Sequence, residues 1–289
     1  MTNQAPSEFF LTKLPANESA LLDSLYAGNV FLLVGNPATQ RLVDAANQEL
    51  DRAFSDVTGG ARVAQFELSG EDFFARIGKL RRQFFEGPRF VQHVKEVIAS
   101  LGVDLGHTAY DPARLRTVCH EGHLNPAAAA VYHGHRDTWY SNPEAMITWW
   151  IPLQDVQPSH TFDFYPDWFA RPAPNDSATF DFDHWVRDGQ KRRIGWQEKK
   201  TGLRETYPRL LADPSGRRFG VQARRAQLLL FSGQHLHQTR QHIDDFTRFS
   251  LDFRTVHLQH FEQSIGPENV DNQSTGSAVV QWVRPEVAT

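Results

Sequence analysis

Two residues that bind transition metals stand close together in a histidine-rich stretch, residues 132–139. His135 and Asp137 are two positions apart. On an extended strand, residues two apart point to the same face, so we expect both side chains on one side. One imidazole from a distant strand would complete a set of two histidines and one carboxylate. That set leaves coordination positions open and is typical of non-haem Fe(II) centres.

Thirteen histidines are present, so residue type alone does not identify the metal ligands. His133 has the same parity as His135, but only His135 has a carboxylate two places on. The distant imidazole is expected from residues 231–237, where His235 and His237 would share one face of an extended segment. A His-x-Asp pattern alone is frequent, and the elements that follow it give it weight.

The order of four elements resembles the Fe(II)/2-oxoglutarate-dependent dioxygenases, particularly the phytanoyl-CoA hydroxylase-like branch. In that superfamily a His-x-Asp, a distal His and an Arg about eleven residues further on lie in fixed order on a double-stranded β-helix. Here His135, Asp137, His237 and Arg248 take these places. His237 is preferred to His235 because it alone lies eleven residues before Arg248.

The resemblance implies Fe(II) as the metal, 2-oxoglutarate and O2 as co-substrates, and succinate and CO2 as products. Arg248 would hold the distal carboxylate of 2-oxoglutarate, since a guanidinium matches a carboxylate in two-point contact. Ser250 or Thr148 would assist it. Asp137 disfavours halogenation, because related halogenases have a small residue at this place. Hydroxylation is the usual outcome, while desaturation, epimerisation and ring closure use the same iron site.

Candidates for substrate contact come from two places. Trp139 and Asn142 follow the His-x-Asp pattern, and each could equally be a packing residue. Arg254 shares a face of the last long strand with Arg248, and we expect it either to hold an acidic substrate or to pair with Asp252. The expected partner is a small polar metabolite, with an anion as one option.

The elements that must position these residues fall into two parts. Residues 1–104 are expected to be largely helical support for a following β-domain. Apolar residues at three-to-four spacing predict helices, and an Asn-Pro pair marks the start of the one at 37–54. The predicted elements are a short helix near 19–26, a strand at 29–35, and helices at 37–54, 71–85 and 89–101.

Residues 105–260, which the resemblance covers, consist of short strands separated by Gly, Pro and Asn, as in a jelly roll. In the last strand, even-numbered polar residues alternate with Phe249, Leu251 and Phe253. We expect the polar set to face a cavity and the apolar set to pack on helices. The predicted strands are 115–119, 146–153, 161–165, 226–231 and 247–256.

The whole chain is therefore expected to be one domain, mainly β with flanking helices, with a double-stranded β-helix of the jelly-roll, cupin-like type. Residues 166–208 are rich in Pro and then in charge, and they are expected to be an insertion of the kind that forms lids or binding loops. Residues 262–289 look polar and peripheral.

Bulk properties exclude several classes. The formal net charge of −4 over 289 residues gives no basic footprint for nucleic acid. Cys119 is the only cysteine, so no disulfide framework is possible within the chain. The apolar run at 30–34 is far too short to span a membrane, and residues 1–6 lack the features of a signal peptide. We therefore expect a cytoplasmic protein.

Two other hypotheses fit the same residues. The first is a cupin-like metalloenzyme that uses the same barrel without 2-oxoglutarate. Arg248 and its spacing from His237 argue against it. The second is a non-catalytic β-sandwich binding module in which the histidines are structural.

Overall fold

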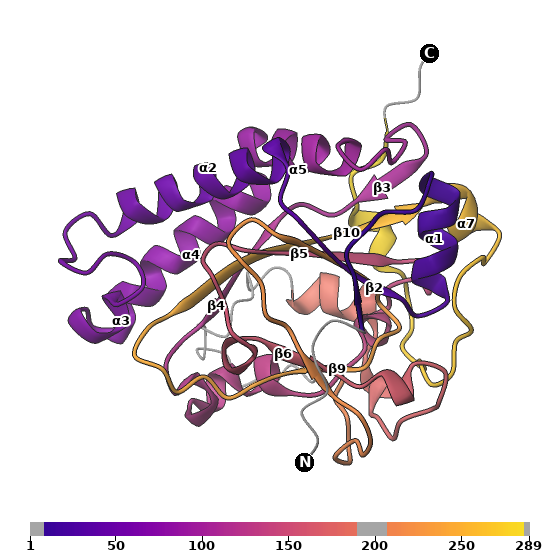
Figure 1. Cartoon of the computed structure of the whole chain (residues 1–289). Helices are drawn as coiled ribbons and strands as arrows, with labels where there is room; N and C mark the ends of the chain where they lie inside the picture. The colour runs from indigo at the N-terminus through magenta and orange to yellow at the C-terminus, as the bar shows by residue number, and fades with distance from the viewer. Residues whose placement is uncertain (1–8, 190–206, 286–289) are drawn as a thin grey trace.

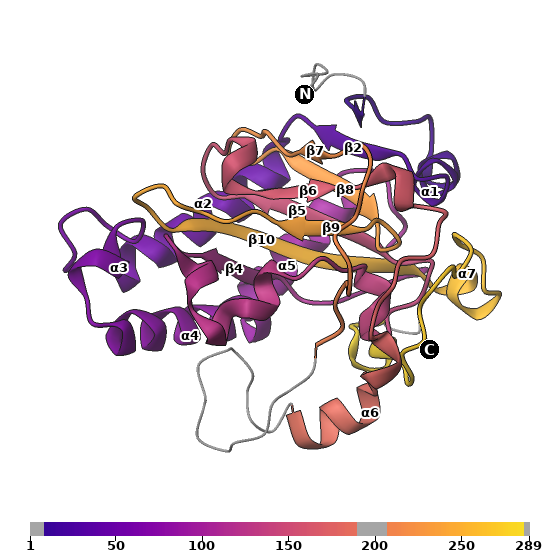
Figure 2. The same cartoon turned by 90° about the horizontal axis from the view of Figure 1, so that it is seen from below.

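A computed structural model describes residues 9–189 and 207–285 (Figure 1). Two β-sheets form the centre, and helices from the first third of the chain cover the outer face of the larger sheet (Figure 2). The covering helices follow the predicted pattern closely. Asn36 caps the longest of them, its side chain accepting the amides of Ala38 and Thr39. The helices are α1 (Glu18–Tyr26), α2 (Pro37–Ala53), α3 (Ala64–Glu67), α4 (Gly70–Glu86) and α5 (Pro88–Ala99).

The larger sheet has seven strands, and its centre matches the strands predicted from the sequence. Branched and aromatic residues fill these central strands, which are buried on both faces. The order is β1 (Phe10–Leu11), β2 (Val30–Leu33), β8 (Leu228–Ser232), β5 (Ile147–Pro152), β10 (Arg248–His257) and β3 (Thr108–Tyr110), with β4 (Arg114–Val118) also paired to β10.

The smaller sheet packs face to face on the larger one. Its strands are β7 (Phe219–Gly220), β6 (Phe162–Phe164) and β9 (His237–Thr239). Aromatic rings join the two sheets: the centroids of Trp150 and Phe162 lie 5.5 Å apart. Phe164 contacts Phe231 in the same layer, at 4.9 Å. The space between the sheets is therefore closed by rings on this side.

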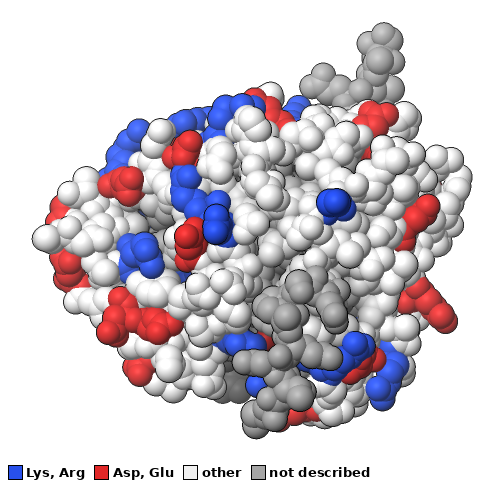
Figure 3. Space-filling model, viewed as in Figure 1, with Lys and Arg blue, Asp and Glu red and all other residues white. Residues whose placement is uncertain are grey.

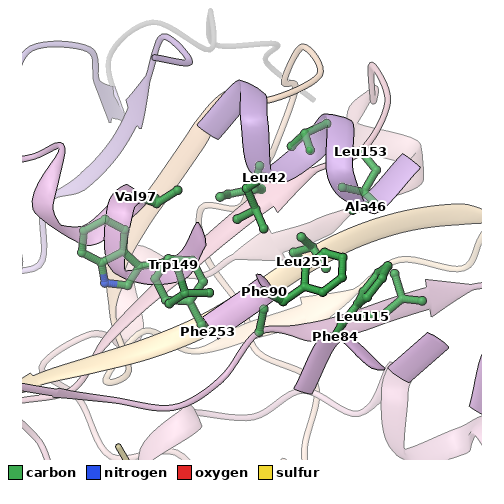
Figure 4. Packing of buried hydrophobic residues seen from close by; sticks show 14 of the residues in the cluster. Leu42, Ala46, Phe84, Phe90, Val97, Leu115, Trp149, Leu153, Leu251 and Phe253 are labelled. Atoms are coloured by element: carbon green, nitrogen blue, oxygen red, sulfur yellow. The ribbon is translucent and has the colours of Figure 1, made fainter. Parts of the chain in front are cut away.

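Strand β10 separates the core from the space between the sheets. Its odd-numbered residues Phe249, Leu251 and Phe253 are fully buried against the helices (Figure 4). Its even-numbered polar residues point the other way, and Arg254 reaches Asp137 at 3.8 Å. The predicted division of this strand into an apolar and a polar face is confirmed. The core partners that Figure 4 labels from α2, α4 and α5 are Leu42, Ala46, Phe84, Phe90 and Val97.

The remaining described segments are short helical turns. Of the predicted insertion, residues 190–206 lie outside the described part. The turns are η1 (Gly122–Leu124), η2 (Pro126–Tyr132), η3 (Asp137–Tyr140), η4 (Pro158–His160), η5 (Pro166–Trp168), η6 (Ser177–Thr179), α6 (Phe182–His184), the π-helix η7 (Trp185–Gly189), α7 (Leu258–Glu262) and η9 (Ala278–Gln281).

Two features of the structure concern binding to nucleic acid and insertion into a membrane: the surface charge and the character of the helices. On the face that Figure 3 shows, basic and acidic side chains are interspersed over the helical side, and much of the remaining surface is uncharged. Among the described residues, no helix combines the length and the apolar character needed to cross a bilayer.

Candidate metal centre

Three side chains meet at one point between the two sheets. His135, Asp137 and His237 each offer a ligand atom, and these atoms all lie within 4.8 Å of one another. His135 Nε2 is 3.6 Å from Asp137 Oδ1. Donor atoms that share one ion through bonds of about 2.1 Å lie roughly 3 to 4 Å apart. The donor set therefore fits a divalent metal after a small contraction.

The expectation that His135 and Asp137 lie on one extended strand is wrong for Asp137. His135 forms an isolated antiparallel bridge with His237, but Asp137 already begins the turn η3. The chain turns there because Asn142 Nδ2 donates to the Asp137 carbonyl at 2.8 Å. Ser141, with a φ of 57°, ends the turn in the left-handed region. The carboxylate still lies beside both imidazoles.

Both imidazoles are oriented by backbone carbonyls. The Nδ1–H of His135 donates to the carbonyl of His133 at 2.9 Å, and that of His237 donates to the carbonyl of His235 at 3.0 Å. A carbonyl only accepts, so each ring carries its proton on Nδ1. Each Nε2 therefore keeps a lone pair for a metal, as metal-binding histidines require.

The carboxylate is held by two neighbours. Thr148 Oγ1 donates to Asp137 Oδ2 at 2.7 Å, and Arg254 Nη2 lies 3.8 Å from Oδ1. Burial would raise the pKa of Asp137, but Arg254 and the two imidazoles outweigh it and hold the pKa well below its usual range. Burial lowers the pKa of His237 to about 4. At neutral pH the site thus offers a carboxylate and a neutral imidazole, the forms that bind metal.

His133 and His235 remain outside this donor set. His235 is fully buried among aromatic rings and lies 4.6 Å, centroid to centroid, from Phe169. Phe164 contacts the same imidazole at 5.3 Å. The structure therefore gives His235 a packing position, whereas His133 supplies a carbonyl to the ligand His135.

Sequence reasoning missed a buried ion pair behind the site. Arg136, between the two proximal ligands, has no exposed surface, and its Nε lies 3.0 Å from both carboxylate oxygens of Asp271. Its Nη2 also donates to the carbonyls of Trp168 and Arg171 at 2.7 Å. The expectation of a peripheral C-terminal segment is therefore wrong around Asp271. No local signal could have revealed this pair, because 135 positions separate its members.

The two candidates for substrate contact after the His-x-Asp pattern are buried. Trp139 has no exposed surface, and its Nε1 donates to Asp271 Oδ1 at 2.8 Å. Asn142 is 8% exposed and holds the carbonyl of Asp137. Both residues support the ligand loop in this structure, and Trp139 offers no surface to a substrate.

Arg248 and Ser250 lie together, as predicted, at the first end of β10. Arg248 is 3% exposed, its Nη1 donates to Ser250 Oγ, and its Nε donates to the carbonyl of His160 at 3.1 Å. Trp150 Nε1 donates to the same Ser250 hydroxyl at 3.0 Å. Thr148 is elsewhere: it pairs with Arg254 in the sheet register and contacts the metal-ligand carboxylate.

Arg254 forms more contacts than sequence reasoning allowed. Its Nη2 lies 3.7 Å from Asp252 Oδ2, the expected pair, but Nη1 is closer to Asp111 Oδ2, at 3.2 Å. The Arg254 amide also donates to Asp111 Oδ1 at 2.6 Å. Arg254 therefore links two structural carboxylates to the ligand Asp137.

A cavity of about 200 Å³ lies away from these residues, between α4, the end of β4 and the turns η1 and η2. Phe73, Thr117, Cys119 and Tyr132 are among its lining residues. None of the three ligands lines it, so it does not define the reaction site.

Comparison with known proteins finds similarity to solved structures. No protein-family model and no curated protein matches the chain. EvdO2 from Micromonospora carbonacea var. aurantiaca, complexed with 2-oxoglutarate, is 11% identical over 86% of this chain and 94% of that chain, with a TM-score of 0.43. The non-heme monooxygenase ThoJ, as apoprotein, is 12% identical over 82% and 76%, with a TM-score of 0.42. SnoN, a non-heme α-ketoglutarate-dependent epimerase from nogalamycin biosynthesis, is 14% identical over 83% and 84%, with a TM-score of 0.35.

ThoJ and SnoN are described as non-haem enzymes, and several of the similar structures were solved with 2-oxoglutarate, iron or nickel bound. Their identities to this chain are 10–15%. At such identities and TM-scores, the similarity carries no argument about the reaction. The phytanoyl-CoA hydroxylase-like branch stays a prediction.

Proposed function

We propose that this protein is a non-haem Fe(II)- and 2-oxoglutarate-dependent oxygenase that hydroxylates a small polar metabolite. The observation that carries the proposal is the convergence of His135, Asp137 and His237, with both imidazoles oriented to present Nε2. Two histidines and one carboxylate on one face of an ion leave three positions open. When bound there, Fe(II) with 2-oxoglutarate and O2 would supply the oxidising chemistry, with succinate and CO2 released.

The architecture supports the same assignment. Two facing sheets carry the ligands, with His237 on the smaller sheet and the Asp137 partner Thr148 on the larger one. We assign this arrangement to the double-stranded β-helix, or jelly roll, that such enzymes use. The single cysteine, Cys119, has no disulfide partner, and we propose a cytoplasmic location on that basis.

Arg248 supports 2-oxoglutarate as the co-substrate. It is almost fully buried, and among the described residues it forms no ion pair with a carboxylate. Burial lowers its pKa to about 10, so it stays charged at neutral pH. A buried cation without a counter-ion is costly, and a bound carboxylate would remove that cost. Ser250 accepts from Arg248 and Trp150, so its own hydroxyl hydrogen is left to donate to the same carboxylate.

The chain's own residues have three tasks in this proposal. Thr148 and Arg254 keep the Asp137 carboxylate in place and ionised. Tyr140 packs its ring edge-on against His135, with centroids 5.4 Å apart, and limits the movement of that imidazole. The paired aromatic rings of the two sheets keep water from one side of the site.

The alternative of a cupin-like metalloenzyme without 2-oxoglutarate leaves the charge of Arg248 unexplained. Desaturation, epimerisation and ring closure would use the same ligands and the same arginine. A non-catalytic binding module does not account for two imidazoles that backbone carbonyls orient beside one carboxylate.

The test separates iron binding from 2-oxoglutarate binding. Under anaerobic conditions the protein is titrated first with Fe(II) and then with 2-oxoglutarate by calorimetry. We expect Arg248→Gln to weaken 2-oxoglutarate binding by about 100-fold and to leave iron binding unchanged. Arg217→Gln is the matched control, since Arg217 is exposed and paired with Asp167. Tight iron binding with no heat from 2-oxoglutarate, and no succinate with any substrate, would establish the cupin-like alternative.

A further inference from the structure

A second arginine on the inner face of the larger sheet is not used by the proposed iron site. Arg116 lies on β4 directly opposite Ser250 of β10, so both point to the same side of the sheet. Leu115 beside it belongs to the core under the helices. Arg116 therefore projects to the side where Arg254 reaches the ligand Asp137.

The contacts of Arg116 leave one edge of its guanidinium free. Nε donates to Asp252 Oδ1 at 2.6 Å and Nη2 donates to Oδ2 at 2.8 Å, a two-point pair that fixes the plane of the group. Asp252 is almost fully buried, yet 47% of the Arg116 side-chain surface is exposed. Among the described residues, no acceptor receives a hydrogen bond from Nη1. Nη1 thus keeps two N–H donors without a partner among the described residues.

About half of the Arg116 side chain is accessible to solvent, and protein covers the rest. Burial lowers the pKa of Arg116, and Asp252 outweighs it, so the pKa is raised overall. The more exposed Arg217 uses the same two nitrogens on Asp167, at 2.9 and 2.7 Å. Asp252 therefore holds Arg116 in place while part of its side chain stays accessible to a ligand.

The charges around Arg116 do not balance. Arg114, Arg116 and Arg254 contribute three positive charges, while their partners Asp111 and Asp252 contribute two negative ones. With Asp137 assigned to the metal and Arg248 to 2-oxoglutarate, these groups leave positive charge in excess. An anionic group on the substrate would offset this excess, and a carboxylate matches the edge of a guanidinium.

We infer that the substrate of the proposed oxygenase carries a carboxylate, and that Arg116 Nη1 holds this carboxylate while Asp252 fixes the guanidinium. The inference rests on the proposed function, because the metal ligands define where the substrate reacts. It adds a binding residue that lies outside the four-element pattern of the sequence.

The first test measures turnover. Carboxylic acids are compared with their own primary amides for the ability to increase succinate formation by the iron-loaded protein. We expect only the acids to do so. Arg116→Gln should raise the KM for the best acid by about 10- to 100-fold, while the protein keeps its affinity for iron and for 2-oxoglutarate. Arg217→Gln should change none of these values. Equal stimulation by acid and amide, or an unchanged KM in Arg116→Gln, overturns the inference.

A loss in Arg116→Gln could also arise because Asp252 is left buried without a partner. The double variant Arg116→Gln/Asp252→Asn removes both charges, and it should show the same loss while keeping the unfolding midpoint closer to that of the parent. A double variant that regains the parent KM shows that Arg116 has no direct contact with the acid and overturns the inference.

The second test does not depend on turnover. With Mn(II) and saturating 2-oxoglutarate in the absence of oxygen, phenylglyoxal labels accessible arginines, and mass spectrometry resolves each site. We expect phenylacetate to slow the labelling of Arg116 but not of Arg217, and phenylacetamide to protect neither. If no acid supports succinate formation but phenylacetate protects Arg116, the proposed function fails and the carboxylate site stands. Absence of protection overturns the site itself.

Discussion

His135 and His237 are joined by a pair of backbone hydrogen bonds: the amide of each donates to the carbonyl of the other, at 2.9 and 3.0 Å. Each imidazole also donates from Nδ1 to the carbonyl two residues before it. Main-chain groups therefore orient both ligands, and the packing of Tyr140 against His135 adds to this. A metal meets two imidazoles that are already in place.

Removing either kind of ligand should abolish tight metal binding. We expect His237→Ala and Asp137→Ala to weaken the affinity for Fe(II) or Mn(II) by at least about 100-fold, because only two of the three protein ligands remain in each variant. Anaerobic calorimetry measures the affinity. His107→Ala is the control, since that imidazole is exposed and pairs with Asp104. Equal affinity in the parent and in all three variants would show that the donor set holds no metal.

The Thr148 hydroxyl should tune the metal site through Asp137. Thr148→Val removes the 2.7 Å hydrogen bond to Oδ2 at nearly constant volume. We expect metal affinity to fall by about 10-fold, the lower end for a lost partner of a ligand. Thr148→Ser keeps the hydroxyl and should restore most of the affinity. A serine variant as weak as the valine variant would assign the effect to packing.

The buried pair behind the ligands should matter for stability. Arg136→Met leaves Asp271 buried and unpaired, and we expect a loss of about 3 to 5 kcal/mol in the free energy of unfolding. Urea denaturation of the metal-free protein measures this. Arg217→Met breaks an exposed pair and should cost less than about 1 kcal/mol. Similar losses in both variants would contradict the role given to Arg136.

Much of this fold was predictable from local pattern. The alternation in β10 and the three-to-four spacing in α2, α4 and α5 both reflect one buried face, which periodicity records directly. The proximity of His135 to His237 came from a resemblance in motif order, because no local rule pairs residues about a hundred positions apart.

The remainder depended on tertiary contacts. The turn at Asp137 follows from a hydrogen bond to Asn142, and the burial of Trp139 follows from Asp271, which belongs to a segment that reads as polar tail. Strand parity gives the face of Thr148 but not its distance along the strand, and in the structure Thr148 lies opposite Arg254 rather than beside Arg248.

Acid should destabilise the metal-free protein through its buried imidazoles. Burial lowers the pKa of His235 to about 3, whereas in the unfolded chain it is near 6.5. Between these values the unfolded state binds a proton that the folded state does not, so stability is complete above pH 6.5 and falls as the pH drops. Each such group contributes about 1.4 kcal/mol per pH unit. His237, with a pKa of about 4, acts in the same direction.

The variant His235→Leu isolates one of these groups. We expect its unfolding free energy to fall less steeply between pH 6.5 and pH 4, by about 1.4 kcal/mol per unit relative to the parent. Urea denaturation at several pH values, with chelator present, gives both slopes. Parallel slopes would mean that His235 is protonated in the folded state.

The two-sided character of β10 also bears on how the gene can change. Strand β9 ends at Thr239 and β10 begins at Arg248, so the connecting segment sets which residue meets which neighbour. Loss or gain of one codon within β10 would exchange its faces and drive arginines under the helices. A one-codon change in the segment between β9 and β10 would leave the faces of β10 unchanged, because that segment can become one residue longer or shorter. Natural length variation in related genes should therefore fall between these strands and never inside β10.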